Sequence, residues 1–191
     1  MEEQLKKAMD EDEKLLWSGR PEKFEILDKT YKPIFLRKSV ISLLVGVFLS
    51  VGYILLAQKN GIGIKWGLFI IVWFFCAISP VNILRDAKSL AGKTVYGMTD
   101  KRLITVADTD TIRTVTFDQL EKASFYTDEA GLTSLICGKE GNLKPGGNLR
   151  GAALSGVSMN EDENKCDRFV LYAVPHADKL RKLLAEHIPV E

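Results

Sequence analysis

The sequence of 191 residues has little of what metal centres and disulfide frameworks are built from. It contains two histidines and three cysteines, and Cys76, Cys137 and Cys166 are far apart, with no Cys-x-x-Cys pair. These absences exclude a clustered zinc site and a disulfide framework, and they favour a reducing compartment. His176 and His187 fall at opposite ends of a predicted helix, too far apart to bind one metal ion. We therefore expect neither a metal ion nor another cofactor.

The sequence also lacks a dominant charge and the motifs of common enzymes. Lysine and arginine total 26 against 25 aspartate and glutamate, a net charge of +1, so nucleic acid is not an expected partner. The one glycine-rich basic stretch, residues 138–156, has neither the Gly-Lys-Ser/Thr ending of a phosphate loop nor the Gly-x-Gly-x-x-Gly order of a dinucleotide site. We interpret it as a connection whose Lys139, Lys144 and Arg150 are candidates to meet a phosphate-bearing surface.

The acidic stretch 160–167 lacks the glycine and the alternating ligand order of a calcium loop, so we interpret it as a solvated turn. Cys166 lies within it and is predicted to be exposed to solvent. No other residue near Cys166 in the sequence is a recognisable catalytic partner. The sequence therefore predicts a protein that is not an enzyme.

Two long uncharged runs dominate the first half of the chain. Residues 39–57 and 66–84 contain no charged residue, and each would span roughly 28 Å as a helix, close to the thickness of the hydrocarbon core of a bilayer. The short polar turn 58–65 between them indicates a helical hairpin. The alternative is a buried helical pair inside a soluble core, but such helices normally keep a polar stripe, and neither run has one. We therefore predict a transmembrane hairpin over residues 39–84.

The charges that flank the hairpin predict its orientation. Basic residues gather before the first run and after the second, and the intervening turn holds only Lys59 and Lys65, so both termini should be cytoplasmic in a two-span protein of the cell membrane. The charged first residues contain no apolar core, so we expect no cleaved signal peptide. The flanking basic residues either set the topology alone or also contact anionic lipid heads. The candidates for that contact are Lys32, Arg37, Lys38, Arg85 and Lys88.

Small residues recur every four positions in and beside the two runs, which predicts faces where helices approach closely. These candidate packing residues are Ser42, Gly46, Ser50, Gly63 and Gly67. The runs contain no Asp, Glu, His, Lys or Arg of the kind that lines ion pathways. The hairpin is therefore predicted to be an anchor rather than a transporter on its own.

After the hairpin, the apolar period changes from helical to alternating. Six short β-rich runs are predicted as antiparallel strands at residues 94–98, 102–107, 112–117, 122–127, 132–137 and 168–174. A seventh strand is proposed within 152–158. The spacing of Leu180, Leu183, Leu184 and Ile188 predicts a terminal helix over 176–187 that packs its apolar face against the strands. We therefore divide the chain into an N-terminal cytoplasmic segment (1–38), the hairpin (39–84) and a β-rich domain (85–191).

Three motifs carry a resemblance to a known family. The stretches DEKLLWSGRPE (12–22), VYGMTDKRLITV (95–106) and IRTVTFDQLEKASF (112–125) resemble the bacterial membrane-anchored pleckstrin-homology (PH) domain family, whose function is largely uncharacterised. Thr99 and Arg102 match its hairpin pattern, and Asp118 and Leu120 match a later turn. The resemblance implies an α+β membrane protein in which the two-helix hairpin precedes a PH-like antiparallel β-barrel or sandwich, capped by a C-terminal helix.

No binding residue follows from this resemblance. Phosphoinositide binding is not expected, because the hairpin tip offers Lys101 beside the repelling Asp100 instead of a long basic loop. Arg102 is expected to point to solvent or to pair locally. We expect a membrane-anchored, non-catalytic binding or scaffolding module that engages the bilayer and either a protein partner or a second copy. The alternative is an accessory subunit of a transport or envelope-stress complex that acts through its transmembrane hairpin.

Overall fold

The computed structural model describes residues 5–107, 111–143, 148–160 and 164–191. The chain divides into two compact units, which are described separately. The hairpin unit comprises residues 26–85, and the β unit comprises the described residues of 1–25 and 86–191.

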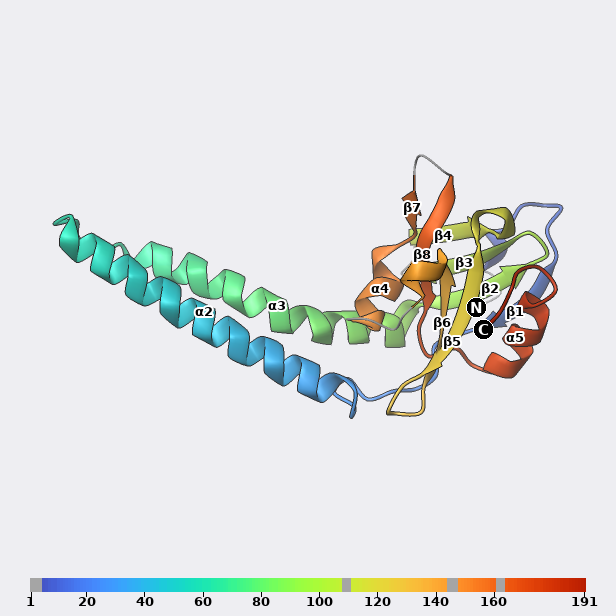
Figure 1. The fold of residues 1–191 in the computed structure, drawn as a ribbon, viewed down its shortest axis with the longest axis horizontal. Helices are drawn as coiled ribbons and strands as arrows, with labels where there is room; N and C mark the ends of the chain where they lie inside the picture. The colour runs from blue at the N-terminus through green and yellow to red at the C-terminus, as the bar shows by residue number, and fades with distance from the viewer. Residues whose placement is uncertain (1–4, 108–110, 144–147, 161–163) are drawn as a thin grey trace. The chain divides into compact units, whose positions relative to one another are not determined.

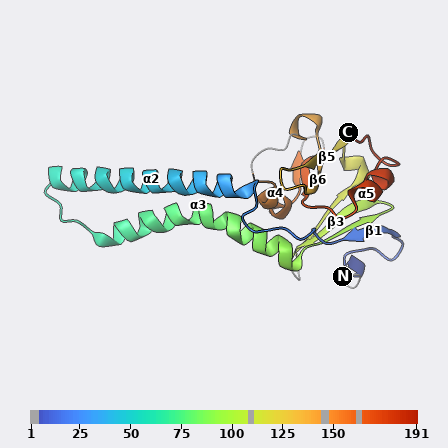
Figure 2. The same cartoon turned by 90° about the horizontal axis from the view of Figure 1, so that it is seen from below.

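Two long helices form the hairpin unit, α2 (Tyr31–Lys59) and α3 (Trp66–Lys93), whose last turns belong to the β unit. They have 29 and 28 residues, or about 43 and 42 Å of helix, and Figures 1 and 2 show them side by side. The carboxylate of Asp28 accepts a hydrogen bond from the Tyr31 backbone N–H at 2.8 Å, at the start of α2. The predicted helical pair is confirmed, and both helices extend beyond the apolar runs into neighbouring basic residues, which are good helix formers.

The apolar side chains of the two helices are mostly exposed. In the most apolar 18-residue window of α2 only 11% is buried, and in that of α3 only 6%. A long helix in a soluble core would instead bury its apolar face. The exposed apolar surface of α2 and α3 is unlike that of a core helix. By length and composition, both helices are long and apolar enough to span a membrane.

The described part of the β unit contains two four-stranded antiparallel sheets. The first has the order β1-β2-β3-β4 and is formed by Leu15–Gly19, Val95–Thr99, Arg102–Ala107 and Thr111–Thr116. The second has the order β5-β6-β8-β7 and is formed by Lys122–Thr127, Thr133–Gly138, Lys165–Leu171 and Ser158–Asn160. In the part of the chain that the structure describes, the two sheets do not join into a closed barrel, so the barrel alternative is wrong.

Six of these strands were predicted, and two differences are informative. Strand β1 was not predicted: it comes from the N-terminal segment 1–38 and pairs with β2. The proposed strand within 152–158 is wrong, because most of it belongs to helix α4 (Leu149–Ser155) and strand β7 begins only at Ser158. Two short 3-10 helices, η1 (Phe117–Gln119) and η2 (Glu140–Asn142), follow β4 and β6.

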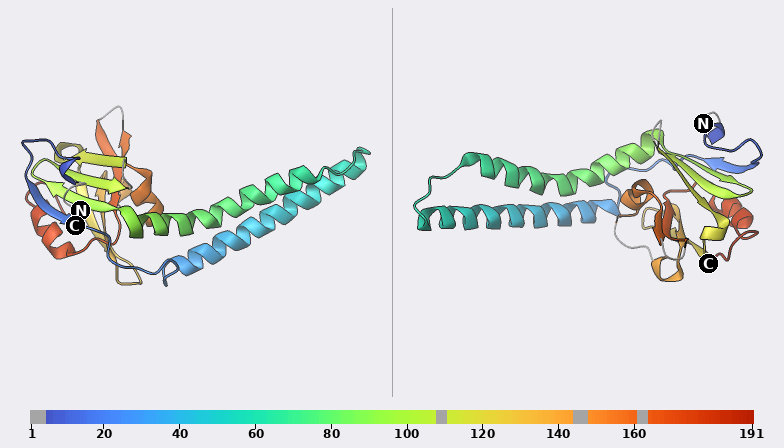
Figure 3. Two further views of the ribbon diagram at one scale, coloured as in Figure 1. Left: turned by 180° about the vertical axis from the view of Figure 1, so that it is seen from behind. Right: turned by 90° about the horizontal axis from the view of Figure 1, so that it is seen from above.

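The main core lies between the two sheets and is closed by helix α5 (Ala177–Leu184). Trp17 and Met98 from the first sheet and Phe169 from the second meet Leu180 and Leu184 of α5 in one buried cluster. Figure 3 shows α5 lying against one end of the two sheets. The packing predicted for the terminal helix is confirmed, although the helix itself ends at Leu184.

The β2–β3 turn is held by its own threonine and by the N-terminal segment. The Thr99 hydroxyl accepts hydrogen bonds from the backbone N–H groups of Lys101 at 3.2 Å and Arg102 at 3.0 Å, as expected of a turn residue. The Arg102 guanidinium forms ion pairs with Glu13 at 2.7 Å and Asp10 at 3.0 Å. The expectation of a solvent-facing or locally paired Arg102 is therefore wrong, because the partners are distant in sequence.

Candidate functional site

Gly46 lies at the contact between the two long helices. A Cβ atom at this position would lie 3.2 Å from the Trp73 ring and 3.4 Å from the Cys76 sulfur. Ser42 lines a pocket of about 190 Å³ between the helices, together with Trp73, Cys76 and Pro80. The hydroxyl oxygen of Ser50 is buried as well. These three small residues of α2 therefore lie where the helices approach each other.

Gly63 and Gly67 are placed differently. Gly63 lies in the loop before α3, and Gly67 lies in the first turn of that helix. A Cβ atom at either position would meet nothing within 4 Å. The structure therefore does not bring these two glycines into the contact between the helices.

The five candidate lipid-contacting residues lie toward the helix ends opposite the connecting loop. Lys32, Arg37 and Lys38 lie in the first turns of α2, and Arg85 and Lys88 lie in the last turns of α3. All are exposed except Lys38, which is half-buried.

Aromatic side chains gather at the loop end of the hairpin. The Tyr53 hydroxyl accepts a hydrogen bond from the Lys65 backbone N–H at 2.8 Å. The Phe69 ring has its centroid 5.5 Å from those of Tyr53 and Trp66. Such a cluster, with Trp66 strongly exposed, is typical of a membrane–water interface.

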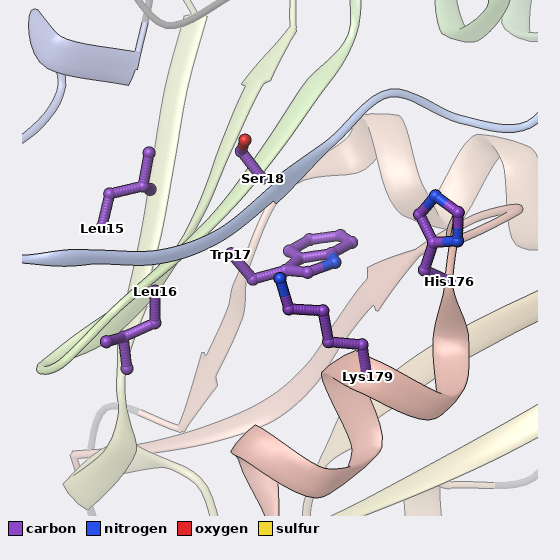
Figure 4. Close-up of a pocket in the computed structure, with 6 residues that line it drawn as sticks. All are labelled: Leu15, Leu16, Trp17, Ser18, His176 and Lys179. Carbon is purple, nitrogen blue, oxygen red and sulfur yellow. The ribbon is translucent and has the colours of Figure 1, made fainter.

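A groove in the β unit runs between strand β1 and the start of helix α5. It has a volume of about 290 Å³, and Figure 4 shows its side chains. The residues that line it are Leu15, Leu16, Trp17, Ser18, His176 and Lys179. Figures 1 and 2 show α5 next to β1. We call this site the β1–α5 groove.

Local backbone features build this groove. The pairing of β1 with β2 shifts between Leu15 and Trp17, which leaves Leu16 as an extra residue in a β-bulge. Gly19 ends the strand against Pro175, whose ring leaves no room for a side chain at that position. His176 precedes α5 in the left-handed conformation, with φ of 53°. The bulge and the tight turn at His176 together set the two walls of the groove.

The groove combines a buried aromatic floor with a polar rim that carries one lysine. Only 4% of Trp17 is exposed, whereas His176 and Lys179 are exposed at the surface. None of the six lining residues is acidic. The arrangement offers hydrogen-bond donors beside apolar surface, and it suits a ligand with an acceptor or a negative charge. The signal in the sequence was the LLWSG stretch, which was part of a motif of the family resemblance but was not predicted to be a strand.

Arg150 was a candidate to meet phosphate, and the structure shows otherwise. Its side chain is fully buried, and its guanidinium carbon lies 4.4 Å from the centre of the Phe24 ring. Its Nη2 donates hydrogen bonds to the Glu25 carbonyl at 3.1 Å and to the Tyr172 hydroxyl at 3.2 Å. Arg150 therefore holds α4 inside the domain and cannot reach a phosphate-bearing surface. Lys139 is half-buried, and Lys144 lies outside the described residues.

Cys166 is also placed differently from the prediction. It is fully buried in strand β8, and burial raises the pKa of its thiol to about 11. Burial likewise raises the pKa of Cys137. Because the thiolate is the reactive form, neither cysteine is placed for nucleophilic chemistry.

The two histidines lie in different parts of the β unit and do not form a shared site. The His187 ring stacks on Phe117 with 4.3 Å between the ring centres, whereas His176 lines the β1–α5 groove. Within the described ranges, no group of three or more His, Cys, Asp or Glu side chains could hold a metal ion.

Comparison of the chain with models of known protein families, with curated proteins and with solved structures found no match.

Proposed function

We propose that this protein is a membrane-anchored, non-catalytic binding module, in which the hairpin spans the cell membrane and a PH-like domain is displayed at the cytoplasmic face. The observation that carries the proposal is the pair of adjacent helices with largely exposed apolar side chains. In water such a surface would associate or aggregate, and in a bilayer it is matched by lipid tails. The positions of the basic residues support cytoplasmic termini, and the cluster of Tyr53, Trp66 and Phe69 supports a membrane–water interface at the loop end of the hairpin.

The PH-like assignment is supported by the two antiparallel sheets and the helix that closes the space between them. The role in binding is supported by the β1–α5 groove, which combines apolar lining with the amine of Lys179. On this proposal, the hairpin holds the domain at the membrane and the groove selects a protein partner.

The alternative is an accessory subunit that recognises its partner through the hairpin. One observation favours it, the pocket on the hairpin that is lined by Ser42, Trp73, Cys76 and Pro80 among others. A helix from another membrane protein could fill such a gap between two helices.

Topology is tested by labelling single cysteines introduced at Asn60, in the hairpin loop, and at Glu129, in the exposed β5–β6 turn. Intact cells should allow a membrane-impermeant reagent to reach Asn60→Cys only. Labelling of Glu129→Cys from outside would rule out the cytoplasmic module.

Partner recognition is tested by photo-crosslinking in native membranes. A photoreactive residue is placed at Ser18, in the groove, or at Leu43, in the hairpin pocket, and the adducts are identified by mass spectrometry. The binding-module proposal expects a specific protein adduct from Ser18. An adduct from Leu43 alone would favour the accessory subunit, and adducts from neither position would contradict both.

A further inference from the structure

We propose that the β1–α5 groove binds a short extended peptide segment that carries a carboxylate, adds to the outer edge of β1 and places its acidic side chain on Lys179. This inference rests on the proposed function, because it names the class of partner that the groove would take.

Strand β1 is the end strand of the first sheet. Within the described residues it pairs with β2 on one side, and its other side borders the groove instead of a strand. An end strand presents backbone donors and acceptors to an added strand, which is a common mode of peptide recognition. The edge therefore offers main-chain hydrogen bonds directly beside pockets for side chains.

The dimensions of the groove favour a short segment. Its volume of about 290 Å³ is at the lower limit of typical small-molecule sites, which run from about 300 to 1,000 Å³. Five residues of β1 extend over roughly 16 Å, and the contact of Gly19 with Pro175 closes one end. The bulge at Leu16 twists the edge, which disfavours pairing with a long strand of a second copy.

The charge of the groove points to a carboxylate. Among the described residues, Lys179 is the one formally charged group that lines the groove, and no lining carboxylate competes for it. The Trp17 ring is almost fully buried beside it, and Figure 4 shows the two side chains turned to the same space. An ion pair formed against this apolar floor is screened less than one in open water. Leu15 and Leu16 give the site an apolar component that an anionic lipid head would not use.

The test uses the full-length protein in detergent micelles and arrays of random seven-residue peptides whose central residue is fixed as Asp, Asn or Lys. We expect the Asp array to bind about tenfold more tightly than the Asn array, as one favourable ion pair would give. Lys179→Glu should transfer the preference to the Lys array. The matched control is Lys182→Glu, which makes the same charge change at an exposed position of α5 outside the groove and should keep the preference for Asp.

A second set of measurements tests the strand addition. Two versions of the best Asp peptide are made, with N-methyl groups on the odd-numbered or on the even-numbered amides. Only alternate amides face the edge of β1, so one version should lose binding and the other should keep it. Binding that is unaffected in both versions would refute strand addition. Equal losses in the Lys179 and Lys182 variants, or binding seen only with phosphatidylglycerol vesicles, would refute the peptide site.

The outcomes separate this inference from the proposed function. If no array binds but the Ser18 crosslink captures a protein, the acidic-peptide inference fails and the binding module stands. If neither gives a signal, both fail.

Discussion

Replacing Arg150 by alanine should destabilise the β unit strongly, although the residue lies in what reads as a loose, glycine-rich connection. The guanidinium joins helix α4 to the chain segment that carries Phe24 and Glu25. It also donates to Tyr172, whose backbone carbonyl and N–H are bound by the Tyr96 hydroxyl at 2.9 and 3.2 Å. One buried side chain thus links α4, the end of β8 and strand β2.

The size of the effect follows from the groups that the change leaves behind. The Tyr172 hydroxyl is buried and loses the Arg150 donor at about 1–3 kcal/mol. The Glu25 carbonyl is only partly buried and can turn to water, so its loss is about 0.5–1.5 kcal/mol. The loss of the cation–π contact with Phe24 adds about 1 kcal/mol. Removing a buried cation recovers part of this through relief of its desolvation. We expect a net loss of about 3 kcal/mol in the free energy of unfolding, out of a typical total of about 5–15.

This loss should lower the melting temperature by roughly 10 °C for a domain of this size. Thermal unfolding of the full-length protein in detergent can be followed by near-ultraviolet circular dichroism from its tyrosines. Hydrogen exchange should rise in peptides that cover α4 and β8. Arg150→Lys should be intermediate, because lysine keeps the charge but loses the planar fork that reaches two acceptors.

The matched control is Arg181→Ala, which removes an exposed guanidinium 4.8 Å from the Phe125 ring centre. It should cost less than about 1 kcal/mol, because the contact is exposed to water. If Arg150→Ala melts within about 2 °C of the wild type, or no lower than Arg181→Ala, the network around Arg150 does not stabilise the domain as argued.

The other predictions concern the hairpin and the buried thiols. Gly46→Leu should separate α2 from α3 at a cost of about 1–3 kcal/mol, because the added side chain would overlap Trp73 and Cys76, whereas Gly52→Leu, with nothing within 4 Å, should be tolerated. Disulfide trapping between cysteines introduced in the two helices would reveal this, and equal trapping in both variants would place Gly46 outside the contact. Cys166 should resist iodoacetamide near neutral pH and react once the protein is denatured, since its pKa is raised from 9.0 to about 11. Its contribution to stability is complete below pH about 9 and is lost as the pH rises toward about 11, because the unfolded state releases the proton first. A Cys166→Ala variant with the same alkaline loss of stability as the wild type would contradict this assignment.

Local patterns were enough to predict the long helices and most of the strands. Residues 39–57 and 66–84 read as helices because an uncharged run of that length has few other stable forms, and the structure places both within α2 and α3. Alternation of side chains and short turns predicted six strands, and the spacing of Leu180 and Leu184 predicted the face of α5 that enters the core. The helices and strands could be predicted because each depends mainly on residues that are close together in the sequence.

Contacts between distant segments decided the rest. Strand β1 has no marked alternation, and it becomes a strand because β2, far along the chain, supplies its hydrogen bonds. Cys166 sits in a polar stretch but faces the core because the register of β8 against β6 and β7 turns it inward. The stretch around Arg150 read as a connection because its glycines favour loops, yet Phe24, Glu25 and Tyr172, all distant in sequence, supply partners for its guanidinium. The β1–α5 groove likewise exists only where two chain segments far apart in sequence meet, so hydrophobicity and turn propensity determined the elements, and long-range pairing determined the site.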